Sequence, residues 1–124
     1  MMNEMFKAVI DADMEPVVIC DMEHRIVYMN PTAIERYEKW GGGKLIGNSI
    51  LDCHNAHSRE VILSVLARFA EDPDLNRVYT YSKKRDGVDS DVYMIALRNE
   101  SGELIGYYEK HESRIHETDS RGQR

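Results

Sequence analysis

The sequence predicts one α+β domain whose elements follow the order strand, strand, helix, short helices, helix and three further strands. Three observations predict this class. Short apolar runs at hairpin spacing lie near both ends of the chain, and apolar residues at helical spacing lie between them. The length of 124 residues allows one hydrophobic core and is too short for two ordinary domains.

The first twelve residues predict an amphipathic helix. Its apolar residues recur at helical spacing and form one stripe, made of Met2, Met5, Phe6, Val9 and Ile10. A helix this short needs a surface to pack against. We therefore divide the chain into an N-terminal amphipathic helix at 1–12, a domain at 13–113 and a mobile C-terminal tail at 114–124, which has too few apolar residues for a core.

A hairpin and a helix start come next. Apolar runs joined by a tight turn predict two strands, at 17–20 and 26–29. Asn30 and Pro31 predict a helix start, because an Asn side chain can accept a hydrogen bond from an unpaired amide and Pro needs no donor at the first helical position. The helix should run toward Trp40, where glycines 41–43 end it. From the cap alone, we expect Asn30→Ala to cost about 1 kcal/mol.

The second half of the chain predicts a long helix and three strands. Apolar residues from Ser58 onward follow helical spacing, and Pro73 ends the helix. Strand-like runs separated by turn residues follow, at 78–83, 92–97 and 104–108. The run at 92–97 is apolar on both alternating rows, so both faces of the sheet need cover.

Two parts of this pattern are similar to a known family. The first is the hairpin with Asn30-Pro31-Thr32-Ala33, and the second is Leu45-Ile46-Gly47-Asn48-Ser49 with the later Gly102-Glu103-Leu104-Ile105-Gly106. Over residues 16–112 they resemble the bacterial sensory domains of the PAS family. The resemblance implies a PAS-like five-stranded antiparallel sheet with helices packed on one face around a small cavity, and a role in signal transduction.

Composition and charge exclude several classes of function. Sixteen Lys and Arg against 22 Asp and Glu give a net charge of -6, which would repel the phosphates of nucleic acid. Two cysteines are too few for a disulfide framework, and no apolar run could span a bilayer, so we expect a cytoplasmic protein without a membrane anchor. No histidine has a nucleophile partner at a recognisable spacing, so we expect no enzyme.

Cys53, His54 and His57 lie within five positions and could hold a ligand, since they offer a thiolate and two imidazoles. A structural zinc site needs four ligands, and this group lacks a local fourth, so we predict no metal site. Through the resemblance, a haem would take His54 or His57 as its axial ligand. The interpretation that we favour has both histidines forming local hydrogen bonds at the helix start, with Cys53 a small core residue.

The cavity implied by the resemblance would suit an apolar or amphipathic small molecule, because the chain holds seven Met and its strands are aromatic. Tyr37 and Met94 therefore join the candidate binding residues. A flavin photosensor of the light-oxygen-voltage kind would need Asn-Cys-Arg-Phe after the glycine step. Gly47 is followed instead by Asn48-Ser49-Ile50, so we expect no such flavin.

The sequence thus predicts a sensory domain that binds a small molecule in an internal cavity and regulates a partner or effector. The stripe of the first helix and the second face of the sheet lack partners of sufficient size, so we expect a homodimer. The alternative is a ligand-free dimerisation or protein-interaction module with a fully packed core. A small cavity enzyme is less favoured, because it needs an acid-base pair inside the cavity.

Overall fold

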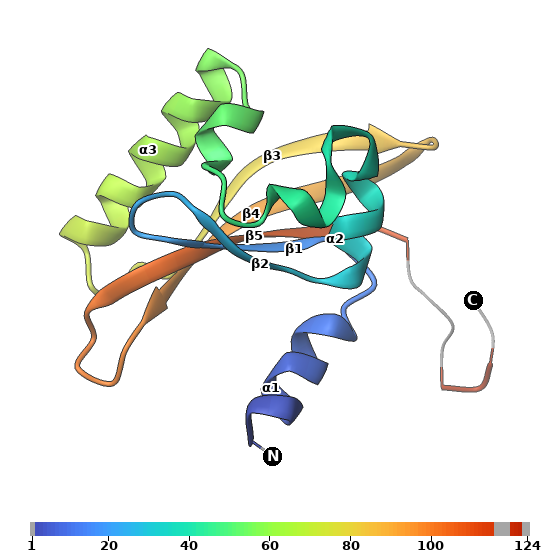
Figure 1. Ribbon diagram of the computed structural model, residues 1–124, viewed down its shortest axis with the longest axis horizontal. Helices are drawn as coiled ribbons and strands as arrows, with labels where there is room; N and C mark the ends of the chain where they lie inside the picture. Colours follow the sequence, from blue (N-terminus) through green and yellow to red (C-terminus); the bar gives the residue numbers. More distant parts are fainter. Residues whose placement is uncertain (1, 116–119, 123–124) are drawn as a thin grey trace.

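The computed structural model describes residues 2–115 and 120–122, apart from the side chains of residues 2 and 53. Five strands form one antiparallel sheet in the order β2-β1-β5-β4-β3 (Figure 1). The strands are β1 (Val17–Asp21), β2 (Ile26–Met29), β3 (Arg77–Arg85), β4 (Val88–Arg98) and β5 (Leu104–Ser113). The predicted α+β class and the five-stranded antiparallel sheet are therefore confirmed.

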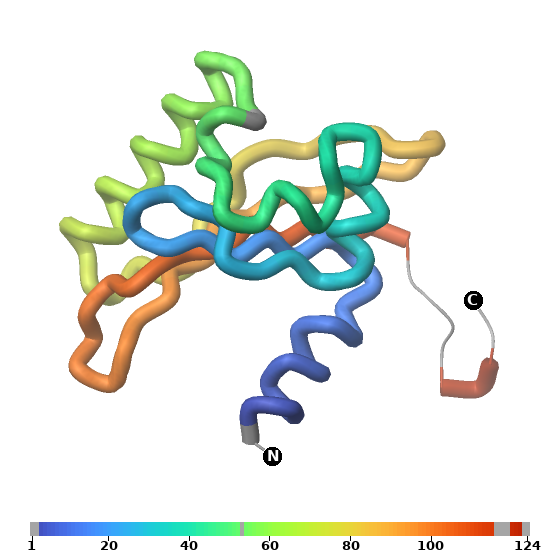
Figure 2. The backbone as a smooth tube through the Cα atoms, in the orientation of Figure 1, coloured from blue at the N-terminus to red at the C-terminus, as the bar shows by residue number. Residues whose placement is uncertain are grey.

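Within the described residues, six helical segments accompany the sheet: α1 (Met2–Asp11), α2 (Pro31–Arg36), the 3-10 helices η1 (Glu38–Trp40), η2 (Gly42–Leu45) and η3 (Ile50–Cys53), and α3 (Ala56–Glu71). The segments from α2 to α3 lie over one face, which we call the cavity face, and the backbone of η1 to η3 winds across it in short turns (Figure 2). The predicted N-terminal helix, α1, projects from the opposite side, which we call the outer face (Figure 1). None of the described helices is long and apolar enough to cross a membrane.

The starts of α2 and α3 follow the same local rule. Asn30 Oδ1 accepts from the Ala33 amide at 2.9 Å, as predicted for α2, and Asn55 Oδ1 accepts from the Ser58 amide at 2.8 Å at the start of α3. The expected continuation of α2 toward Trp40 is wrong, because the helix ends at Arg36. The backbone then tightens into i to i+3 bonds and forms η1.

Asn30 does more than cap α2, because its side chain is completely buried. Its Oδ1 also accepts from the Val17 amide at 3.0 Å, where β1 begins. Its Nδ2 donates to the Glu15 carbonyl at 3.0 Å and lies 3.3 Å from the carbonyls of Ile10 and Asp13. One side chain thus holds the end of α1, the start of β1 and the start of α2 together.

The core lies between the cavity face and the helices above it. Alternate residues of β1, β4 and β5 meet the apolar side of α3, and the buried members include Val18, Cys20, Ile62, Val65, Phe69, Met94, Ala96 and Tyr107. At Gly106, strands β1 and β5 approach so closely that an added Cβ would lie 2.5 Å from the Cys20 carbonyl oxygen. Glycine is therefore required at this position of the sheet.

The outer face and α1 leave apolar side chains in contact with solvent. On α1, Met5, Phe6 and Val9 are 61%, 57% and 73% exposed. On the sheet, Tyr79 is 52% exposed, and the outer row of partly exposed residues includes Ile19, Tyr93, Ile95 and Tyr108. The stripe predicted from helical spacing is thus an uncovered surface of this chain.

The C-terminal strand extends further than its apolar run suggests. β5 reaches Ser113, and Arg114 Nη2 lies 2.7 Å from Asp91 Oδ1 on β4. Of the mobile tail predicted at 114–124, residues 116–119 and 123–124 lie outside the described part of the chain. The division into helix, domain and tail remains a prediction.

Candidate functional site

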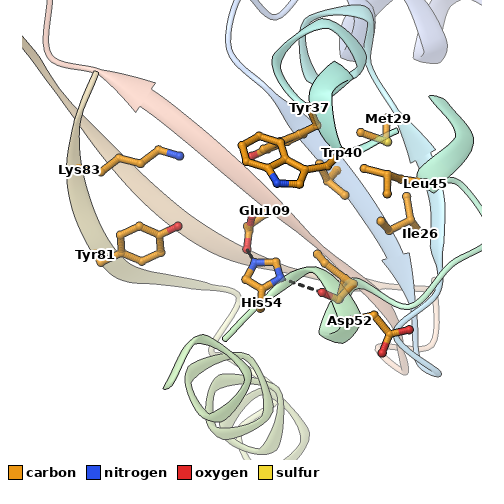
Figure 3. Close-up of a pocket in the computed structure, with 12 residues that line it drawn as sticks. Ile26, Met29, Tyr37, Trp40, Leu45, Asp52, His54, Tyr81, Lys83 and Glu109 are labelled. Carbon is orange, nitrogen blue, oxygen red and sulfur yellow. Dashed lines mark hydrogen bonds and ion pairs between the residues drawn. The ribbon is translucent and has the colours of Figure 1, made fainter. Parts of the chain in front are cut away.

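A cavity of about 370 Å³ lies between the cavity face and the segments η1 to η3 (Figure 3). Small-molecule sites in proteins usually measure roughly 300–1,000 Å³, so the cavity is at the lower end of that range. Its apolar lining comes from Val18, Ile26, Met29, Trp40, Leu45 and Ile50. Its polar lining comes from Tyr37, Asp52, His54, Tyr81, Lys83 and Glu109.

Two glycines bring Trp40 and Leu45 to the same cavity. Gly41 has a φ of 121° and Gly42 a φ of 51°, a left-handed region that glycine enters without steric cost. The chain can therefore turn sharply between η1 and η2. A side chain on Gly42 would also lie 3.2 Å from the Ile34 carbonyl oxygen. The glycines predicted to end a helix thus shape the cavity wall as well.

Glu109 on β5 is a buried carboxylate at the polar end of the cavity. His54 Nε2 lies 3.7 Å from Glu109 Oε2, while His54 Nδ1 lies 2.7 Å from the Ile50 carbonyl oxygen (Figure 3). Because a carbonyl only accepts, Nδ1 carries a proton and Nε2 faces the carboxylate. The nearby carboxylate of Glu109 raises the pKa of His54 above 6.5, against the effect of burial. Burial alone would raise the pKa of Glu109, but the adjacent imidazole of His54 holds it below 4.5.

His111, two residues further along β5, is a second buried imidazole beside Glu109. Its Nε2 lies 4.0 Å from Glu109 Oε1, and neither ring nitrogen has a hydrogen-bond partner among the described residues. Burial, followed by the nearby charge of Lys83, lowers the pKa of His111 to about 4. The ring is therefore neutral at pH 7.

Lys83 and Tyr81 reach the cavity from β3, opposite Tyr37 (Figure 3). Burial lowers the pKa of Lys83 from 10.5, and no described residue forms an ion pair with its ammonium group. Burial also raises the pKa of Tyr37 above 10.0 and that of Tyr81 to about 12. Both hydroxyls therefore keep their protons at neutral pH, and neither is hydrogen-bonded to another described residue.

A second cavity of about 260 Å³ lies between α3 and the strands β3 and β4. It is lined by His54, His57, Ser58, Val61, Ile62, Thr80, Tyr81, Met94 and Glu109. His54, Tyr81 and Glu109 line both cavities. The pair of His54 and Glu109 is therefore part of the wall that separates the two spaces.

The predicted binding residues divide between these cavities. Tyr37 lines the first, His57 and Met94 line the second, and His54 lines both. The side chain of Cys53 lies outside the described part of the structure. His54 Nδ1 makes a local contact with the Ile50 carbonyl, and Asn55 caps the start of α3.

Sequence reasoning missed the strand residues Lys83 and Glu109, together with Tyr81. A signal was present for Glu109, since Glu109 and His111 are ionisable residues in a row of β5 that is buried next to β1 and β4. Strand pairing, which the sequence does not state, brings β5 and β3 to the same cavity. Within the described residues, no three metal-binding side chains gather at one place.

The chain is similar to a known protein family and to several solved structures. A family model described as PAS fold matches residues 10–110. A C-terminal domain from Streptococcus mutans is similar over 90% of this chain and 84% of its own, with a TM-score of 0.72 and 17% identity. A PAS domain from Colwellia psychrerythraea is similar over 90% and 95%, with a TM-score of 0.66 and 15% identity.

The Aer2 receptor from Vibrio cholerae, described as a dual PAS-heme oxygen sensor, is similar over 82% of this chain and 95% of its own. Its TM-score is 0.56 and its identity 19%. At such low identities these likenesses concern the fold alone. None of the curated proteins matches the chain in sequence.

Proposed function

The chain belongs to the PAS fold family, and from this premise we propose that it binds a small molecule in the 370 Å³ cavity and regulates a partner through dimerisation. The fold is a sensory and signalling one, and PAS domains are generally sensory rather than catalytic. The cavity carries the proposal. A mostly apolar wall with a few convergent polar groups is the ordinary composition of a small-molecule site.

Strand β5 offers a physical route from this cavity to α1. Glu109 faces the cavity, and the next residue, Lys110, points to the opposite side of the strand. There Lys110 Nζ lies 2.8 Å from Asp13 Oδ2, just after α1 ends. A ligand that interacts differently with two positions of β5 would shift their populations, and α1 would move with the strand.

The uncovered stripe of α1 and the apolar outer face support dimerisation. Large exposed apolar patches mark interaction sites in soluble proteins. A second copy of the chain offers the same surface, and a two-fold dimer would bury both copies of it at once. Occupancy of the cavity could then change how the two copies are held together.

Native mass spectrometry of the purified protein tests the ligand part of the proposal. We expect a bound small molecule in the wild type and in Ile46→Phe, whose side chain does not line the cavity. Leu45 lines the cavity, so the larger side chain of Leu45→Phe should fill it and prevent the small molecule from binding. Thermal unfolding of each variant would establish that both remain folded.

Fluorescence provides a second readout, because Trp40 is the chain's single tryptophan and lines the cavity. Addition of small apolar and amphipathic molecules should change its emission in the wild type and much less in Leu45→Phe. Bare chain masses together with an unresponsive Trp40 would count against the proposal. That result would instead favour the ligand-free dimerisation module.

A further inference from the structure

We propose that the ligand is a small organic anion, a carboxylate on an apolar body, and that Lys83 binds its charged group. This inference rests on the proposed function, since it names the ligand class for the same cavity. It begins from the charges that line the space. Lys83 supplies an ammonium group there that has no ion-pair partner within the part of the chain that the structure describes.

The other charges of the cavity are already matched or lie at its edge. The carboxylate of Glu109 faces His54 at 3.7 Å, and His111 is neutral at pH 7. Asp52 is exposed and therefore screened by solvent. Among the described residues that line the cavity, Lys83 is therefore the cation without an ion pair, although the charge of Glu109 also acts on it. This arrangement is local, because the whole chain carries a net charge of -6.

Two neutral hydroxyls complete the anion-binding group. Tyr37 and Tyr81 line the same cavity as Lys83, and the side chains of Lys83 and Tyr81 point from β3 toward Tyr37 across it (Figure 3). Both hydroxyls retain their protons and can donate. A carboxylate has two oxygens that accept several hydrogen bonds, and bonds between charged partners are the strongest of this kind.

The apolar wall defines the rest of the ligand. Opposite the lysine and the two tyrosines lie the apolar side chains of Ile26, Met29 and Leu45 (Figure 3). An inorganic anion would leave them uncovered. Burying apolar area stabilises a complex, so a ligand with an apolar body gains affinity where phosphate does not. The indole of Trp40 adds a flat surface at the same wall. The cavity therefore matches a carboxylate with an aromatic or short aliphatic body.

Chemical-shift titration of the 15N-labelled protein tests this directly. Benzoate, benzyl alcohol and benzylamine carry one ring with a negative, a neutral or a positive substituent. We expect benzoate to bind most tightly, with shifts at cavity residues, and inorganic phosphate not to bind there. Octanoate as a further probe distinguishes an aliphatic from an aromatic body.

Variants of two adjacent lysines identify the anchor. Lys83→Met keeps the aliphatic stem and removes the charge, so benzoate should bind about 10- to 100-fold more weakly while benzyl alcohol is unaffected. Lys84→Met is the matched control, because Lys84 is exposed and pairs with Asp89 on the surface. It should leave benzoate binding unchanged. The dispersion of the amide spectrum reports whether each variant is folded.

The possible results separate this inference from the proposed function. Benzyl alcohol or benzylamine binding in the cavity as tightly as benzoate would overturn the inference and leave a ligand-binding domain. Equal weakening of all three probes in Lys83→Met would also overturn it. Failure of the wild type to bind any of the probes, octanoate included, would count against both.

Discussion

The two faces of the sheet differ in what they leave unsatisfied: one buries ionisable groups, and the other exposes apolar side chains. The cavity face is covered by α2, α3 and the 3-10 helices, yet it holds the ionisable groups Glu109 and His111. The outer face carries apolar side chains such as Tyr79 and Ile95, yet it is partly exposed. A buried polar group is costly unless it is paired, and exposed apolar area is costly unless it is covered. The first face therefore suits a polar ligand group, and the second suits another apolar surface.

Asn30 connects α1, on the outer face, with α2, on the cavity face. Its replacement should lower the free energy of unfolding more than any other change described below. Asn30→Ala removes the acceptor for the amides of Val17 and Ala33 and the donor to the Glu15 carbonyl. Each buried group left unpaired costs roughly 1–3 kcal/mol, so we expect a loss of about 4 kcal/mol of unfolding free energy. Urea denaturation measures this change.

Asn55→Ala is the matched control for that experiment. Asn55 caps α3 in the same way but is exposed, so water can replace the lost bond. Its removal should cost only about 1 kcal/mol. If the two variants lost equal stability, Asn30 would be an ordinary helix cap and would not connect the faces.

Asn30 also illustrates what the sequence could and could not predict. The Asn-Pro pair predicts a cap, because capping depends on neighbouring residues alone. Its bonds to Ile10, Asp13 and Glu15 depend on how α1 and the segment after it pack beside the hairpin, which neighbouring residues do not specify. The cost of about 1 kcal/mol expected from the cap alone leaves these bonds out.

The candidate site shows the same division between local and long-range information. His54 was predicted from its cluster with Cys53 and His57, and Tyr37 as an aromatic residue suited to an apolar ligand. Both line the cavity. Lys83 and Glu109 lie on strands β3 and β5, far apart in sequence, and reach the cavity because β5, β4 and β3 are neighbours in the sheet. A local pattern of residues does not specify that order.

On the cavity face, His111 should make the free energy of unfolding decrease as the pH falls. Its pKa of about 4 lies below the ordinary 6.5, so the unfolded chain binds a proton first as the pH falls. Stability is then lost between pH 6.5 and pH 4, and the loss from pH 7 to pH 5 should be about 2 kcal/mol. The charged groups whose fields act on this ring are Lys83, Glu109, Arg36 and Lys110.

His111→Leu removes this dependence, because it replaces two unpaired ring nitrogens with apolar atoms of similar volume. Urea midpoints of the wild type and the variant at pH 7 and pH 5 should therefore diverge, with the wild type losing about 2 kcal/mol more. Parallel losses in the two proteins would show that other groups account for the acid sensitivity.

On the outer face, one charge on the stripe of α1 should weaken the proposed dimer. Val9 is 73% exposed, and a glutamate there would be buried without a partner in the dimer. We expect Val9→Glu to raise the dimer dissociation constant about tenfold or more, as measured by analytical ultracentrifugation. Ala8→Glu, on another side of the same helix, should leave it unchanged. A dimer that survived both Val9→Glu and removal of residues 1–12 would contradict this use of the outer face.

The smallest effect is expected for His54→Ala and His57→Ala, which should leave haem binding unchanged. His54 Nδ1 is engaged by the Ile50 carbonyl and its Nε2 faces Glu109, while His57 is exposed and lines the smaller cavity of about 260 Å³. Neither ring therefore presents an unengaged nitrogen to the main cavity. After addition of haemin, we expect the wild type, His54→Ala and His57→Ala to give the same Soret absorption and the same affinity. A band lost in one variant alone would identify an axial ligand and replace the organic anion with a haem as the proposed occupant. A carboxylate ligand has no Soret band, so identical spectra would leave the organic anion as the proposed occupant of the cavity. The benzoate titration would then remain the test of the cavity face.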